Sequence, residues 1–135
     1  LYKGMGLKIK KLSNSSYEIY CKTLKPIKKI STKEFPGYPT DLQAQLIATQ
    51  LKSGLKSKVV ENIFENRFIH IPELRRFGAN LSIKGKTVTI DKTSNLLGAE
   101  VMATDIRASF SLIIAAMMSK GKTVINRIYH LGVEG

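Results

Sequence analysis

The chain has 135 residues, of which 43% are hydrophobic, and this is enough for one domain with an apolar core. No stretch approaches the roughly 20 apolar residues that a membrane span needs, and no apolar leader is visible near the N-terminus. A net charge of +12 admits anionic partners, but the lysines are spread along the whole chain, which favours a solvated surface. The single cysteine, Cys21, excludes an internal disulfide and fits a reducing compartment, so we expect a cytoplasmic protein.

The N-terminal part of the chain predicts extended structure. Alternating apolar residues predict a strand at 7–12 with its apolar side chains inward, and a returning strand at 17–21 after a polar turn. Another extended segment is expected at about 25–31. Two prolines and a glycine at 35–39 exclude a helix and predict a shaped loop that leads into one.

The first long helix is expected at 41–52. Thr40 is a suitable N-cap, and Gln43 three residues later completes the pattern of a capping box. Gly54 marks the end of the helical pattern. The β-branched run that follows predicts a strand at 59–64.

The C-terminal half predicts a short helix at 72–77, a hairpin of 81–83 with 87–90, and a second long helix capped by Thr104. A strand at 123–129 follows this helix. We expect the buried face of the second helix to consist of five apolar residues: Ile106, Phe110, Ile113, Ile114 and Met117.

A short phrase occurs twice and organises these elements. Residues 39–44 (PTDLQA) return as residues 103–108 (ATDIRA), and each copy opens a helical run followed by a glycine and a β-branched stretch. A repeated phrase predicts a fold built from copies of one supersecondary unit, here of the α/β class. We therefore expect the two long helices to begin at the same end of the molecule.

The repeat also draws attention to charged residues at helix starts. The helix dipole stabilises an acid there by about 0.3–1 kcal/mol. This effect would explain a single acid at a helix start, but it explains less well why both copies of the repeat carry one, Asp41 and Asp105. An acid held ionised at this position can accept a hydroxyl hydrogen bond or act as a base. Arg107 opposes the dipole, and a guanidinium beside free helix N–H groups suits a carboxylate or phosphate. Arg67 follows the end of a predicted strand. Strand ends are common positions for binding-site residues in α/β folds, but an arginine there can also be an ordinary surface residue.

Other sites are not indicated. His70 and His130 have no partner at ligand spacing, so no metal is expected. Cys21 lies in a predicted strand and has no helix N-terminus beside it to activate a thiolate. The chain carries no glycine-rich phosphate loop or serine-hydrolase elbow, and we expect no cofactor.

Four long motifs, at 35–45, 61–75, 98–109 and 126–130, resemble the signatures of the UDP-N-acetylglucosamine 1-carboxyvinyltransferase family. The resemblance covers nearly the whole chain. It implies an inside-out α/β barrel with two domains, each made of three βαβαββ-type units. Residues 1–135 would then be an incomplete C-terminal domain, roughly two of its three units with the last one truncated. This agrees with a chain that does not begin with Met.

The resemblance also implies roles for particular residues. Asp41 would contact the sugar-nucleotide hydroxyl and serve as the catalytic general base, and Ile63 would lie against the nucleotide sugar. Arg67, Asp105 and Arg107 would line the cleft near phosphoenolpyruvate. The family's reactive cysteine and its Lys–Asn pair belong to the other domain, and this chain's cysteine does not match that cysteine. The implied partners are the two small substrates and the missing N-terminal domain, with no nucleic acid, membrane, metal or cofactor.

Two alternatives remain at this level. A 3-phosphoshikimate 1-carboxyvinyltransferase-like enzyme is one, although the segments at 65–68 and 127–130 argue against it. A non-catalytic basic module that binds RNA is the other, and a steep salt dependence of RNA binding would identify it. Residues 131–135 depart from the carboxyvinyltransferase pattern, which continues there with an acidic residue, an arginine and a helix.

Overall fold

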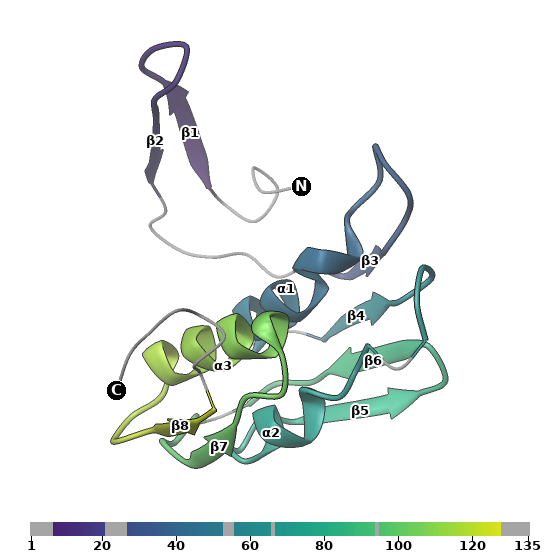
Figure 1. The fold of residues 1–135 in the computed structure, drawn as a ribbon, viewed down its shortest axis with the longest axis vertical. Helices are drawn as coiled ribbons and strands as arrows, with labels where there is room; N and C mark the ends of the chain where they lie inside the picture. The colour runs from purple at the N-terminus through teal and green to yellow at the C-terminus, as the bar shows by residue number, and fades with distance from the viewer. Residues whose placement is uncertain (1–6, 21–26, 53–55, 66, 94, 128–135) are drawn as a thin grey trace.

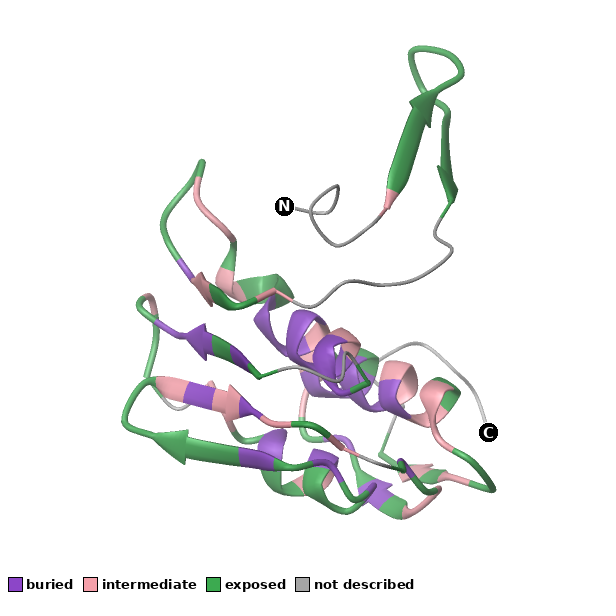
Figure 2. Ribbon diagram, turned by 180° about the vertical axis from the view of Figure 1, so that it is seen from behind, coloured by how far each residue is buried: buried purple, intermediate pink, exposed green. Residues whose placement is uncertain are grey.

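The computed structural model describes residues 7–20, 27–52, 56–65, 67–93 and 95–127. Over these residues the chain is an α/β structure in which the helices lie on one face of a four-stranded sheet, as Figures 1 and 2 show from opposite sides. The core fills the space between helices and sheet with buried side chains such as Ile47, Leu112, Phe77 and Val88. None of the helices in the described part has the length and hydrophobicity that a membrane crossing requires.

Within the described ranges the strands form three sheets. In the central sheet the order is β3-β4-β6-β5, with bounds Lys29–Ser31, Ser57–Val60, Thr87–Ile90 and Leu81–Lys84. Strands β7 (Glu100–Met102) and β8 (Val124–Asn126) form a parallel pair, and β1 (Lys8–Lys11) and β2 (Tyr17–Tyr20) form an antiparallel hairpin. The predicted hairpin of 81–83 with 87–90 is confirmed, and its turn places Gly85 at φ 59°.

The internal repeat appears in the topology as two βαβ units. Helix α1 (Gln43–Gln50) connects the parallel strands β3 and β4, and helix α3 (Ile106–Met118) connects β7 and β8. Parallel neighbours need such a crossover, and the helix supplies it. The two helices begin at the same end of the molecule, as expected from the repeat (Figure 1). Between the units lies the short helix α2 (Ile71–Arg75), with Pro72 in its first turn.

The start of the first helix differs from the prediction. A 3-10 turn, η2 (Thr40–Leu42), precedes α1, and no side chain caps either element. The capping box is wrong because Thr40 Oγ1 and Gln43 Nε2 both donate to the carboxylate of Glu61, at 2.7 Å and 3.1 Å. The two side chains that the local pattern predicted to cap the helix therefore bind a buried acid from a different segment.

The second helix differs in its cap and its buried face. Asp105, not Thr104, is the N-cap, and its Oδ1 accepts from the Ala108 N–H at 2.8 Å. Three of the residues expected to be buried are instead exposed: Ile106, Phe110 and Met117. The core is built from Ala108, Leu112 and Ala115, because α3 packs closely against α1 through its small side chains.

Two strand predictions also change. Strand β4 ends at Val60 rather than continuing to Phe64, because the N–H groups of Ile63 and Phe64 bind the Glu61 carboxylate instead of a neighbouring strand. The hairpin of β1 and β2 is exposed on both faces, so the expected inward side chains have no core to enter (Figure 2). Cys21, His130 and residues 128–129 of the expected last strand lie outside the described residues.

Candidate functional site

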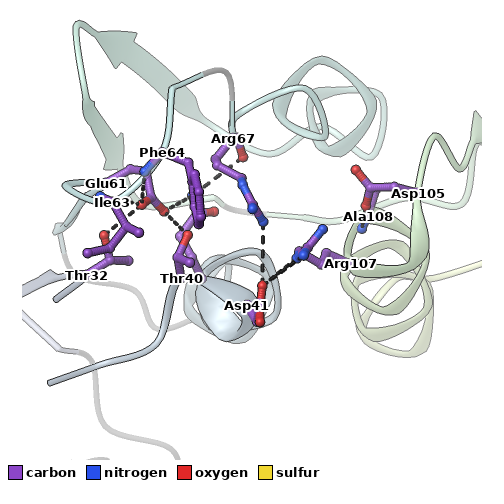
Figure 3. Close-up of polar contacts among 11 residues, drawn as sticks. Thr32, Thr40, Asp41, Glu61, Ile63, Phe64, Arg67, Asp105, Arg107 and Ala108 are labelled. Carbon is purple, nitrogen blue, oxygen red and sulfur yellow. Dashed lines mark hydrogen bonds and ion pairs between the residues drawn. The ribbon is translucent and has the colours of Figure 1, made fainter. Parts of the chain in front are cut away.

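An aspartate lies between two arginines where the two helices begin. Asp41 Oδ1 accepts from Arg107 Nε at 2.9 Å and also lies 2.9 Å from Arg107 Nη2. Arg67 Nη1 lies 3.6 Å from the same oxygen (Figure 3). We call these three residues the Asp–Arg cluster. It carries one negative and two positive charges, and with the nearby N-terminus of α3 it favours an anion.

Three different segments supply the Asp–Arg cluster. Asp41 projects from η2, Arg107 is the second residue of α3, and Arg67 follows the loop that leaves β4. Arg67 is half-buried, and its guanidinium lies 4.3 Å from the centroid of the Phe64 ring, a cation–π contact. Asp41 is the most exposed member, so its second carboxylate oxygen remains open to a ligand.

The carboxylate of Glu61 joins these segments from below. It is almost completely buried and accepts from five donors on three parts of the chain. Thr32 Oγ1 donates at 2.8 Å from the end of β3, and the Ile63 and Phe64 N–H groups donate from the loop. Thr40 and Gln43 donate from the helix that carries Asp41. Figure 3 shows how Glu61 thereby fastens the Asp41 turn to the loop that carries Arg67.

The donors also determine the charge of this acid. Burial by itself raises the pKa of Glu61, but the hydrogen bonds from Thr40, Thr32, the Ile63 N–H and Gln43 outweigh it and place the pKa below its usual value. Glu61 is therefore a carboxylate at neutral pH, neutralised by dipoles rather than by a cation.

A cavity of about 570 Å³ lies beside the Asp–Arg cluster. Its wall is the loop after β4, including Ile63, Phe64 and Arg67, together with Lys86 from the turn between β5 and β6. The cavity combines aromatic and aliphatic side chains with two cations and with two acids, Glu61 and Glu65. This combination suits a ligand that is partly apolar and carries polar or charged groups.

A second, much smaller cavity of about 20 Å³ lies on the other side of Arg67. His70 and Asp105 line it together with Arg107. Burial lowers the pKa of His70 to about 4, although the nearby Asp105 carboxylate and a hydrogen bond to the Arg67 backbone act in the opposite direction. The imidazole is therefore neutral at pH 7.

We expect the stability of the folded protein to fall on acidification from pH 6.5 to about 4 because of His70. Its folded pKa of about 4 lies below the ordinary 6.5, so the unfolded state binds more protons throughout this interval. The expected loss is on the order of 2–3 kcal/mol. Urea unfolding of the full-length protein at a series of pH values measures it, and in the variant His70→Gln this part of the pH dependence should disappear. An unchanged pH slope in the variant would contradict the assignment.

The structure brings Asp41, Arg67 and Arg107 into direct contact. Ile63 and Asp105 flank this cluster without touching it, one in each cavity. Asp105 uses its carboxylate as a helix cap, so the two acids of the repeat differ in their local roles. Among the described residues, no group of three or more His, Cys, Asp or Glu is placed to hold a metal ion.

Sequence reasoning overlooked three contributors to the site. Glu61 could have been noticed as a charged residue at the end of a buried strand, a position that needs a partner. Phe64 and His70 carry no comparable signal, because their roles depend on which residues the fold places beside them.

The chain resembles known proteins in both sequence and fold. A sequence model of the family described as EPSP synthase (3-phosphoshikimate 1-carboxyvinyltransferase) matches residues 1–134. UDP-N-acetylglucosamine 1-carboxyvinyltransferase of Rhodopseudomonas palustris strain HaA2 is 57% identical over 102 residues, which are 76% of this chain and 24% of that protein. The protein of the same name from Endomicrobium trichonymphae is 45% identical over 129 residues, 96% of this chain and 31% of that protein. The chain thus spans about a quarter to a third of the length of these curated relatives.

Solved structures share the fold. The enolpyruvyl transferase NikO from Streptomyces tendae superimposes with a TM-score of 0.78 at 23% identity, over 94% of this chain and 29% of that one. EPSP synthase from Acinetobacter baumannii superimposes with a TM-score of 0.74 at 15% identity, over 93% of this chain and 30% of that one. At these identities the likeness concerns the fold, and it supports the expected α/β architecture of repeated units.

Proposed function

The chain belongs to the EPSP synthase (3-phosphoshikimate 1-carboxyvinyltransferase) family, and from this premise we propose that the complete protein is a UDP-N-acetylglucosamine 1-carboxyvinyltransferase of peptidoglycan synthesis. It transfers the enolpyruvyl group of phosphoenolpyruvate to the 3′-hydroxyl of the sugar nucleotide and releases phosphate. The observation that carries this proposal is the Asp–Arg cluster, in which a carboxylate and two guanidiniums meet beside a cavity.

In this reaction Asp41 takes the proton of the sugar hydroxyl, the hydroxyl oxygen bonds to C2 of phosphoenolpyruvate, and the electron pair of the C2–C3 double bond takes up a proton at C3. In the later elimination C3 loses a proton, the double bond forms again and the C2–O bond to phosphate breaks, so that phosphate leaves and the enolpyruvyl ether remains on the sugar. Arg67 and Arg107 neutralise the carboxylate and phosphate charges of phosphoenolpyruvate. Ile63 and the larger cavity accommodate the nucleotide sugar, and Asp105 shapes the cleft from the start of α3.

We further propose that residues 1–135 are part of the C-terminal domain and that the N-terminal domain of the same protein closes the site from the other side. The chain matches only about a quarter to a third of the length of these relatives, which supports its being one part of a longer protein. The single cysteine is consistent with work in the cytoplasm.

The chain of residues 1–135 by itself should not release phosphate from phosphoenolpyruvate, whereas the full-length protein should do so in the presence of UDP-N-acetylglucosamine. Groups on both sides of the cleft are needed to stabilise the charge that develops during transfer. A coupled phosphate assay on both purified proteins measures this difference. Turnover by the short chain would contradict the proposed two-domain site.

The same assay separates the second candidate, because the family description names 3-phosphoshikimate as the acceptor. We expect phosphate release with UDP-N-acetylglucosamine and none with 3-phosphoshikimate, since the relatives that are 45–57% identical carry the former name. The opposite preference would reverse the assignment. Tight RNA binding with a steep salt dependence and no turnover would favour a basic binding module instead.

A further inference from the structure

The small cavity behind the Asp–Arg cluster is lined by polar groups that lack partners. It lies between the start of α1, the start of α3 and the turn at 67–70. Among the described residues, five buried side-chain polar atoms have no hydrogen-bond partner, and three of the five belong to residues that line this cavity: Gln43 Oε1, Arg67 Nη1 and His70 Nε2. Such groups cost free energy unless something satisfies them.

Gln43 and His70 already use their other polar side-chain atom. Gln43 Nε2 donates to Glu61 at 3.1 Å, which leaves its carbonyl oxygen as an acceptor toward the cavity. The His70 ring donates to the Arg67 backbone carbonyl, so the proton of the neutral ring is on Nδ1 and Nε2 is an acceptor. Arg67 Nη1 lies 3.6 Å from Asp41, beyond hydrogen-bond length, and remains a donor.

We propose that this cavity binds one water molecule, which accepts a hydrogen bond from Arg67 Nη1 and donates to Gln43 Oε1 and His70 Nε2. One donor and two acceptors match one of the two lone pairs and the two protons of a water molecule. The volume of about 20 Å³ exceeds the 10–15 Å³ or so that one water requires and is too small for a larger ligand. A cation would be repelled by Arg67, and an anion by the two acceptors.

Through this water, His70 becomes a positioning residue for Arg67. The guanidinium already rests on the Phe64 ring at 4.3 Å, and its buried Nη1 lies 3.6 Å from Asp41 Oδ1. A hydrogen bond from Nη1 to the water adds a further contact that fixes the orientation in which Arg67 meets phosphoenolpyruvate. This kinetic consequence rests on the proposed function, whereas the water site itself does not.

A high-resolution crystal structure of the full-length protein tests the water directly. We expect a density peak within about 2.6–3.2 Å of all three atoms. ¹⁵N spectra of the same protein labelled at histidine should report a neutral His70 with the proton on Nδ1. An empty cavity, or a proton on Nε2, would overturn the proposal even if the enzyme is active.

Two variants of the full-length protein test the positioning role. His70→Leu removes the acceptor, and we expect the KM for phosphoenolpyruvate to rise roughly tenfold with a smaller change in kcat, the loss of about one hydrogen bond. His70→Gln is the matched control, because its carbonyl oxygen can accept from the water, and it should restore most of the affinity. Equal KM values for the two variants at equal melting temperature would overturn the role. An inactive wild-type protein whose crystals hold the water would contradict the proposed function but not the water site.

Discussion

In the full-length protein, replacing Asp41 with Asn should lower kcat by roughly 10²–10⁴-fold, because an amide cannot take the proton of the sugar hydroxyl. The amide oxygen can still accept from Arg107 Nε, which now donates to Asp41 Oδ1 at 2.9 Å, so the local geometry should survive. The loss of negative charge leaves both arginines less neutralised, and the KM for phosphoenolpyruvate should therefore not rise. Steady-state phosphate release at varied concentrations of both substrates separates these effects.

Two further substitutions calibrate this result. Asp91→Asn alters a surface acid whose Oδ1 lies 3.8 Å from Lys56 Nζ, and it should leave turnover unchanged. Asp105→Asn keeps the helix cap, since Asn also caps helices, and should lower activity less than Asp41→Asn. Near wild-type turnover in Asp41→Asn with unchanged substrate affinity would show that another group is the base. Asp41 would then serve only to hold the two arginines.

Replacing Glu61 with Gln should both destabilise the protein and remove most of its activity. In Glu61 one carboxylate oxygen accepts from Thr40 and Gln43, and the other accepts from the Ile63 and Phe64 N–H groups. A glutamine amide has only one acceptor oxygen, so its N–H₂ group must face one of these two sets of donors. Loss of charge-assisted hydrogen bonds and burial of unsatisfied donors should cost about 2–4 kcal/mol. The midpoint of urea unfolding should fall accordingly, provided the slope is unchanged.

The activity of this variant should fall even under conditions in which it remains folded. Glu61 joins the turn that carries Asp41 to the loop that carries Arg67, so its loss separates the two sides of the cluster. Glu18→Gln is the control, because Glu18 is an exposed acid of the β1–β2 hairpin and lines none of the cavities described above. A Glu61→Gln protein as stable and active as Glu18→Gln would refute the role assigned to the buried carboxylate.

The local pattern of the sequence was sufficient to predict that the fold contains repeated units. The repeated phrase predicted copies of one supersecondary unit, and the structure contains two βαβ units. The hairpin of 81–83 with 87–90 was also predicted, whereas strand β7 was not. The repeat and the hairpin were predictable because periodicity and turn chemistry act between residues that are near each other in the chain. Asp41 and Asp105 were found because the repeat places an acid at both helix starts, and Arg107 was found because it opposes the preference of a helix N-terminus for negative charge.

The tertiary structure alone decided which side of each element is buried and which groups meet. Apolar spacing indicates a helical face but not the neighbour that covers it, so the small side chains of α3 face α1 while Phe110 and Met117 remain exposed. Thr40 donates to Glu61 instead of capping the helix. The sequence did not reveal this bond, because the donors to Glu61, such as Thr32 and Thr40, lie on separate elements that meet only in the folded protein. For the same reason it did not reveal the bond between Asp41 and Arg107. A contact between residues distant in the chain depends on how whole helices and strands pack against each other. At such a contact, the cost of burying an unpaired polar group or the gain from pairing two charges outweighs the weaker conformational preferences of a single turn.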